Sequence, residues 1–304
     1  MIKSFKELIE KAKVLENKKV AIVSSLSEHT VKSGILAKEN DIAEPVFIGN
    51  KEKIEEILKE LGKEPSDYII EDSKSEEESA LKAVEMAKKG EVDIILKGNI
   101  STSTLMKKIL AKESGLRTGN LLSDVFITED TSKDYQKLIG MSDGGINILP
   151  SLEEKKAIID NAVKVFRRLG YEKPKVAVLS CVEYVNEKIP STVEAKKLQE
   201  MNEKGEIKDC IVEGPLALDL AVSEFAAKLK GVEGKVVGNA DILIVPNIEA
   251  GNIFGKSFTY FTHLKVGHII VGAKIPILIP SRAETEEDRL NSIAIAVFME
   301  NLFE

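Results

Sequence analysis

The chain has 304 residues, of which 43% are hydrophobic and 31% charged, so it suits one large or two medium globular domains and is too apolar to be disordered. Its net charge is −7 and its aromatic content 5%, with no basic stripe, which argues against a nucleic-acid partner. No apolar run approaches the roughly 18 residues of a membrane span, and the charged stretch 1–19 lacks the apolar core of a signal peptide, so we expect a cytoplasmic protein.

The chain alternates between short runs rich in Val and Ile and longer amphipathic segments. This rhythm predicts an α/β fold with mostly parallel sheets and helices on both faces. Capping-box spacing, Ser4 with Glu7 and Ser191 with Glu194, predicts the starts of two helices, and a last helix is expected over Glu286–Leu302. The expected strands are Val20–Ser24, Pro45–Ile48, Tyr68–Glu71, Ile94–Lys97, Val125–Thr128, Leu138–Met141, Val176–Ser180, Cys210–Val212, Ile242–Pro246, His268–Val271 and Pro276–Ile279.

So many strands are more than a single doubly wound sheet usually holds. The segments Val125–Thr128 and Leu138–Met141 are separated only by a short polar stretch, which predicts a β-hairpin. This hairpin interrupts the alternation of strands and helices. We therefore expect a domain junction near Asn120.

The two cysteines and three histidines are too scattered for a disulfide framework or a metal site, so no metal is expected. Polar residues do gather where predicted strands end, and ligands of such sheets bind outside the carboxyl ends of the strands. These strand ends are Ser24-Ser25, Lys97-Gly98-Asn99, Gly214-Pro215, residues 247–252 and Ser281-Arg282.

The segment Ala250–Ser257, A-G-N-I-F-G-K-S, fits a relaxed phosphate-loop pattern after a predicted strand. Such proteins also need an acidic residue at another strand end to hold Mg²⁺, but the neighbouring strands end in Ala273 and Ser281. A Gly- and Asn-rich turn that feeds a helix is the favoured interpretation. No G-x-G-x-x-G follows a predicted strand, so the motif of nicotinamide-dinucleotide-binding domains is missing. No G-x-S-x-G follows one either, so the nucleophile motif of α/β-hydrolases is missing as well.

Two other stretches are candidates for phosphate binding. Arg282 follows an apolar strand, where its guanidinium could hold a phosphate with two hydrogen bonds; a surface salt bridge is the alternative. Asp288, with Thr285 at capping-box spacing, is expected to start a helix, and it can belong to an anion site at the same time, because a helix start that faces a crevice binds anions. The stretch Lys97–Lys108, K-G-N-I-S-T-S-T-L-M-K-K, could present backbone N–H groups to a phosphate or be a plain strand–turn–helix connection.

Together these stretches resemble the phosphate acetyl/butyryltransferase family. One shared motif is P-S-R, which begins at Pro280 and is followed by an acidic helix start. A second is A-D-I-L-I-V-P-N from Ala240, with the G-N pair and the lysine that follow it. Gly214–Ala221 and Gly272–Pro276 are similar to the butyryltransferase branch. The similarity extends over nearly the whole chain.

The resemblance implies a role for individual positions. Ser281 would stabilise the oxyanion formed when phosphate attacks a thioester, Arg282 would bind phosphate, and Asp288 would exchange a proton with the coenzyme A sulfur. Lys107 would stand where acetyltransferases carry a phosphate-site Arg. The full set of expected substrate-binding residues is Lys97, Asn99, Ser101, Lys107, Asn247, Glu249, Gly251, Asn252 and Lys256.

The resemblance also implies two α/β/α domains, residues 1–120 with 269–304 and residues 121–268, with the active site in a cleft between them. Acyl-CoA, coenzyme A, phosphate and acyl phosphate would be the substrates and products, no cofactor would be needed, and the chain would form a homo-oligomer. Phosphate acetyltransferase activity is the nearest alternative. A P-loop nucleotide-binding protein and a non-catalytic small-molecule binder are alternatives of other classes.

Overall fold

The computed structural model describes residues 1–131, 136–281 and 284–299. The chain divides into two compact units. We call Phe5–Asn120 with the residues from Lys265 onward the flanking unit, and Met1–Ser4 with Leu121–Leu264 the central unit. The first residues belong to the central unit because Ile2 is buried and its N–H donates to the carbonyl of Leu169 at 2.8 Å.

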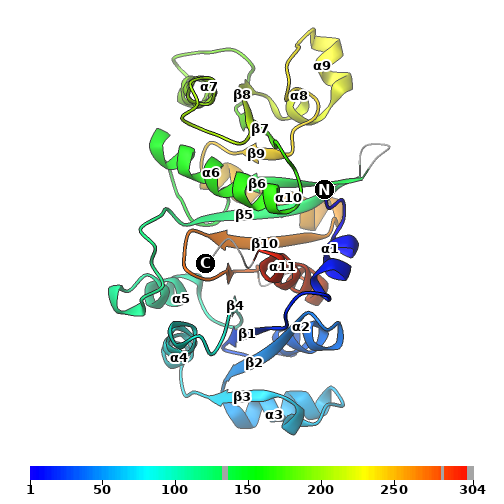
Figure 1. The fold of residues 1–304 in the computed structure, drawn as a ribbon, viewed down its shortest axis with the longest axis vertical. Coiled ribbons are helices and arrows are strands. Elements are labelled where there is room, and N and C mark those ends of the chain that lie inside the picture. Colours follow the sequence, from blue (N-terminus) through cyan, green and yellow to red (C-terminus); the bar gives the residue numbers. More distant parts are fainter. Residues whose placement is uncertain (132–135, 282–283, 300–304) are drawn as a thin grey trace. The chain divides into compact units, whose positions relative to one another are not determined.

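The flanking unit is an α/β/α layer structure (Figure 1). Its strands are parallel except for the antiparallel pair β10–β11, which the sequence analysis did not predict. The strand order is β3(Ile69–Asp72), β2(Ala43–Gly49), β1(Lys18–Val23), β4(Ile94–Lys97), β11(Ile277–Leu278), β10(Val266–Val271). The helices are α1(Phe5–Ala12), α2(Glu28–Glu39), α3(Lys51–Glu60), α4(Glu76–Lys89), α5(Thr102–Ile109) and α11(Glu286–Phe298), with short 3₁₀ turns at Pro65–Asp67 and Lys112–Ser114.

The central unit has the strand order β5(Ser123–Asp130), β6(Lys137–Ser142), β9(Ile242–Ile244), β7(Lys175–Leu179), β8(Ile211–Leu216). The predicted hairpin is confirmed, since β5 and β6 are antiparallel while the other pairs are parallel. The helical segments are α6(Leu152–Arg168), α7(Pro190–Glu203), α8(Leu218–Val222), α9(Glu224–Lys230), α10(Ile248–Ser257) and the π-helical turn η3(Phe258–Thr262).

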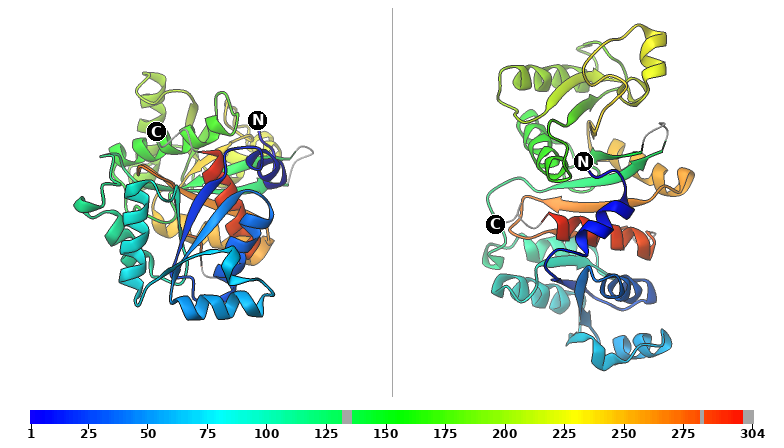
Figure 2. Two further views of the ribbon diagram at one scale, coloured as in Figure 1. Left: turned by 60° about the horizontal axis from the view of Figure 1, so that its bottom comes forward. Right: turned by 45° about the vertical axis from the view of Figure 1, so that its right-hand side comes forward.

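Neighbouring residues of β6 show how helices cover both faces of the central sheet. A methyl group on Gly140 would lie 2.4 Å from the ring of Phe166 in α6, so α6 packs directly on the strand there. Met141, the next residue, reaches Gly255 of α10. Because successive strand residues point to opposite faces, α6 and α10 lie on opposite sides of the sheet, as Figure 2 shows.

Each strand segment predicted from the sequence overlaps an observed strand. The reason is burial: strands covered on both faces consist of unbroken apolar runs, and Val20 to Val23 are all fully buried. Helix α1 begins at Phe5, directly after Ser4, as predicted.

The predicted capping box at Ser191 and Glu194 is wrong. Helix α7 begins at Pro190, whose fixed φ suits the first helical position, so Ser191 lies inside the helix. Its hydroxyl instead contacts that of Ser180 at 2.8 Å, and Glu194 pairs with Lys155. Complete capping boxes stand at the starts of α6, with Ser151 and Glu154, and of α11.

A buried ion pair joins three strands of the central unit. Lys137, at the start of β6, donates to Asp241 Oδ1 at 2.9 Å and to the carbonyl of Ala240 at 2.7 Å, and its side chain is only 3% exposed. The other oxygen of Asp241 accepts from the N–H of Lys175 in β7 at 2.8 Å. Asp241, the acidic residue of the A-D motif, therefore holds the sheet together.

We predict that Asp241→Ala lowers the free energy of unfolding by about 3–5 kcal/mol, because it leaves the buried Lys137 charge without its partner. Urea denaturation followed by circular dichroism measures this. Asp219→Ala is the matched control, since its pair with Lys230 is exposed and contributes little. A similar, small loss for both variants would contradict a structural role for Asp241.

Candidate functional site

Three strand ends meet at one edge of the flanking sheet. Strand β4 pairs in parallel with both β1 and β11, so all three end on the same side. The chain continues there into Ser24, Asn99 and Ser281. The first two loops are joined directly: the N–H of Gly98 donates to Val23 O and that of Asn99 to Ser24 O, both at 2.9 Å. This edge is the place that the sequence analysis predicts for a ligand.

Gly98 permits the close approach of these two loops. A methyl group on Gly98 would lie 2.4 Å from the carbonyl oxygen of Val23 and 2.9 Å from that of Ser24. No other residue type fits without separating the loops.

Asn99 is held by the first turn of α2. Its Oδ1 accepts hydrogen bonds from the hydroxyls of Ser27 and Thr30, each at 2.9 Å. Ser27 is the N-cap residue of α2 but does not cap it with its side chain. The arrangement leaves the Asn99 amide nitrogen, a hydrogen-bond donor, without a partner among the described residues. Such a donor at a helix start suits an anionic ligand.

The other residues of this stretch are placed differently. Lys97, the last residue of β4, is buried at 5% exposure. Ser101 caps α5, accepting from the N–H of Thr104 at 3.0 Å, with the Ser103 hydroxyl 2.9 Å away. Lys107 is exposed in the last turn of α5, about 9 Å along the helix from the cap at 1.5 Å per residue. The structure thus brings Asn99 and Ser101 to helix starts and leaves Lys107 at a helix end.

Ser281 follows β11 and is held through its backbone. Its N–H donates to Glu284 Oε1 at 2.9 Å, and its carbonyl accepts from Arg289 Nη2 at 3.2 Å. Arg282, predicted to bind phosphate, lies outside the described residues. The Ser281 hydroxyl is therefore carried by a fixed backbone at the edge described above.

Asp288 occupies the third position of α11 and is 7% exposed. Its Oδ2 accepts from the N–H and hydroxyl of Thr285 at 3.1 and 2.8 Å, and its Oδ1 accepts from the N–H of Val266 at 3.0 Å. The predicted capping box is confirmed. Both oxygens are occupied by structural donors, while the acid/base role remains a prediction.

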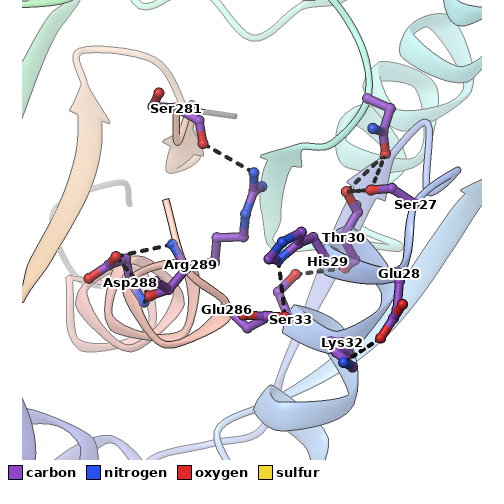
Figure 3. A network of polar contacts seen from close by, with 12 residues as sticks. Ser27, Glu28, His29, Thr30, Lys32, Ser33, Ser281, Glu286, Asp288 and Arg289 are labelled. Carbon is purple, nitrogen blue, oxygen red and sulfur yellow. Dashed lines mark hydrogen bonds and ion pairs between the residues drawn. The ribbon is translucent and has the colours of Figure 1, made fainter. Parts of the chain in front are cut away.

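Several residues of this region were not expected from the sequence. His29 Nδ1 lies 3.0 Å from Glu286 Oε1, which joins the first turns of α2 and α11 (Figure 3). Glu284 and Arg289 contact the Ser281 backbone, and His268 lies 3.1 Å from Glu284. The scarcity of arginine in the chain was the only sequence signal that pointed to Arg289.

The phosphate-loop interpretation of Ala250–Ser257 is wrong, and so is the predicted turn. Helix α10 already begins at Ile248, so the segment is helical and cannot wrap its N–H groups around a phosphate. Asn247 caps the helix by accepting from the N–H of Ala250 at 2.9 Å. Gly251 permits close packing, since a methyl group there would lie 2.7 Å from Gly144 Cα.

The remaining expected binding residues of α10, Glu249, Asn252 and Lys256, all lie on its exposed face. Their spacing of three and four residues places them in one row. Their contact with a substrate stays a prediction.

A buried carboxylate in the central unit was also missed. Asp143, directly after β6, accepts from the N–H groups of Gly145 and Ile146 at 2.8 and 2.9 Å. Burial, with the nearby Asp124 carboxylate, raises the pKa of Asp143 to about 6. A polar residue followed by Gly-Gly at a predicted strand end was the signal available.

None of the helices in the described part of the chain is long and apolar enough to cross a membrane. Within the same residues, no group of three or more His, Cys, Asp or Glu side chains could hold a metal ion.

Comparison with known proteins gives consistent matches. The family model described as Phosphate acetyl/butaryl transferase matches residues 69–297. The phosphate butyryltransferase of Clostridium acetobutylicum is 42% identical over 98% of this chain and 99% of its own. The phosphate acetyltransferase of Thermotoga maritima is 42% identical over 96% of this chain and 98% of its own. The crystal structure of a branched-chain phosphotransacylase from Enterococcus faecalis superposes with a TM-score of 0.80 at 32% identity, over 94% of this chain and 99% of that chain.

We predict that Asp288→Asn separates the two roles of this side chain. An amide has one acceptor oxygen, so one buried N–H, of Val266 or Thr285, loses its partner, at a cost of about 1–3 kcal/mol of folding free energy. If Asp288 is also the acid/base, turnover per folded molecule falls roughly 10²–10⁴-fold. Urea denaturation and a coupled turnover assay measure both effects.

Ser151→Ala is the control, because it breaks the capping box of α6 and costs about 1 kcal/mol while turnover stays unchanged. Wild-type turnover of folded Asp288→Asn in both directions would leave Asp288 with a structural role alone.

Proposed function

The chain belongs to the phosphate acetyl/butyryl transferase family, and on that premise we propose that it transfers a short acyl group between coenzyme A and inorganic phosphate. Butyryl-CoA is the substrate we favour. The observation that carries the proposal is the match to phosphate butyryltransferases over 98% of the chain, together with Ser281, the serine of the family's P-S-R sequence, at a polar strand edge.

The reaction needs little from the protein beyond positioning and charge stabilisation. A phosphate oxygen attacks the thioester carbonyl carbon, and the carbonyl oxygen becomes an oxyanion. The C–S bond then breaks, which gives acyl phosphate and the coenzyme A thiolate, and the thiolate takes up a proton. Phosphate is already a nucleophile at neutral pH, so no cofactor is required in this proposal.

In this proposal the Ser281 hydroxyl donates to the oxyanion, where hydrogen-bond donors have their largest effect. Arg282 neutralises the phosphate, and Lys107 adds a point charge. Asn99 and Ser101, at the starts of α2 and α5, supply polar groups to the same edge of the sheet. Helix starts favour anions, which agrees with the charge of both substrates.

The length of the acyl group is the part of the proposal that similarity supports least. Relatives named for butyryl and for acetyl transfer are equally similar to this chain, at 42% identity. An enzyme distinguishes two substrates that differ by one methylene by only about 1–3 kcal/mol in an apolar pocket. A few side chains that line the acyl pocket therefore decide the preferred chain length. Phosphate acetyltransferase activity is therefore the second candidate. A cytoplasmic location remains part of the proposal.

We also propose that two copies of the chain pair through the exposed face of α10. Ile253 in the middle of this face is 72% exposed, and Tyr260 and Phe261 in the following turn are 58% and 85% exposed. Apolar side chains that gather in this way usually mark an interaction surface.

A second copy is the partner that the charges of this face fit. Glu249 and Lys256 stand two turns apart, with Ile253 between them. When two such helices meet antiparallel about a twofold axis, each Glu249 faces the Lys256 of the other copy. The surface is therefore complementary to itself.

We predict phosphate-dependent thiol release from acyl-CoA. Measured with acetyl-, butyryl- and longer acyl-CoA, release should require phosphate and be fastest with butyryl-CoA. Ser281→Ala should lower the rate roughly 10²–10³-fold, because one oxyanion donor is lost. Release that is independent of phosphate would indicate a thioesterase and contradict the transferase.

We predict that Glu249→Lys and Lys256→Glu each weaken dimerisation roughly tenfold or more, because both symmetry-related contacts become repulsive. The double charge exchange should restore it. Sedimentation velocity over a concentration series measures the dissociation constant. Leu229→Glu is the control, because Leu229 is as exposed as Ile253 but belongs to a different helix, α9. A monomeric wild type, or a double exchange as weak as either single variant, would refute the pairing.

A further inference from the structure

The peptide groups at Ser281 are held on both sides by buried charged side chains. Glu284 accepts from the Ser281 N–H at 2.9 Å, and Arg289 donates to the Ser281 carbonyl at 3.2 Å, as Figure 3 shows for the arginine. Glu284 and Arg289 are each only 4% exposed. The Glu284 N–H adds a further bond to the same carbonyl at 3.2 Å. The backbone that carries the Ser281 hydroxyl has little freedom to move.

Both side chains are anchored to other strands. Glu284 Oε1 lies 3.1 Å from Nε2 of His268 on β10, and the His268 N–H donates to the Ser292 hydroxyl at 2.9 Å. Arg289 Nη1 donates to the carbonyl of Lys97, the last residue of β4, at 3.4 Å. Ser281 and Glu284, which follow β11, are thus tied to both neighbouring strands.

Glu284 keeps its negative charge in this setting. Burial alone would raise its pKa, but the nearby His268 charge, the hydrogen bond from the Ser281 N–H and the Arg289 charge together lower the pKa below the ordinary value. The side chain therefore stays a pure acceptor at neutral pH, and the Ser281 N–H always has a partner.

Stability does not explain this arrangement. Glu284 Oε2 and Arg289 Nε are buried and have no hydrogen-bond partner among the described residues. Each such atom costs folding free energy, and well-packed apolar residues would serve stability at least as well. A buried polar atom without a partner therefore calls for an explanation other than stability, and a role in function is one.

We propose that Glu284, His268 and Arg289, here called the Ser281 clamp, are positioning residues that fix the Ser281 hydroxyl where the oxyanion forms. The clamp rests on the acyl transfer proposed above and acts only through Ser281. It does not touch the substrate. The clamp contributes by orienting the Ser281 hydroxyl, and the orientation of a catalytic group affects the rate of the chemical step most.

Glu284→Ala should lower kcat roughly 10–100-fold, because misplacement of a catalytic group by about an ångström has an effect of this size. The KM values for butyryl-CoA and phosphate should change little, since the loss falls on the transition state. Glu284→Gln retains an oxygen for the Ser281 N–H and should recover most of kcat. Glu287→Gln removes an exposed charge from the first turn of α11, three residues further along the chain, and serves as the control.

A double-mutant cycle distinguishes positioning from a general structural effect. If the clamp acts through Ser281, the Ser281→Ala/Glu284→Ala protein should be no slower than Ser281→Ala alone. Additive losses would overturn the clamp, and so would wild-type kcat in Glu284→Ala while Ser281→Ala is impaired. Wild-type kcat in folded Ser281→Ala would remove Ser281 from the mechanism, and the clamp with it. Should Glu284→Ala fail to fold, the same cycle with Arg289→Lys gives the same alternatives.

Discussion

Strand β11 enters the flanking sheet beside β4, with Ile277 opposite Ile95 and Leu278 opposite Leu96, and the candidate site depends on this pairing. It brings a segment from near the end of the chain to the strand edge built by the first third. Ser281 reaches the same edge as Asn99 only because the two strands are parallel. The helix that follows, α11, then packs on α2 and β10. Without this insertion Ser281 would have no fixed position.

Two buried charged networks show how differently such groups serve a protein. In the central unit, Lys137 and Asp241 satisfy one another and the surrounding backbone, and the result is a fixed sheet. In the flanking unit, Glu284 and Arg289 leave polar atoms unpaired while they hold one serine. A fully satisfied buried network makes a structure rigid, whereas each unpaired buried polar atom costs folding free energy.

Helix α10 explains why a phosphate-loop pattern arose without a phosphate loop. Its glycines are spaced for close packing: Gly251 meets the Gly144 loop, and Gly255 faces Met141 of β6. Its Lys256 belongs to the opposite, exposed face. A pattern of residue letters cannot distinguish these two uses of glycine, because both require the absence of a side chain.

The sequence by itself determined the strands, the hairpin and the helix start at Thr285. Strands buried on both faces must be apolar throughout, and a capping box is a contact between residues three apart, so both leave a local signature. Sequence reasoning failed locally at Ser191, where Pro190 begins the helix instead. Only the tertiary structure decided which polar residues meet. The contacts of Glu284 with His268, of Arg289 with Lys97 and of Asp288 with Val266 join segments far apart in the chain. Such contacts depend on strand order, which no short stretch of sequence specifies. The polar residues that make them also occur commonly on exposed surfaces, so their types alone do not predict burial.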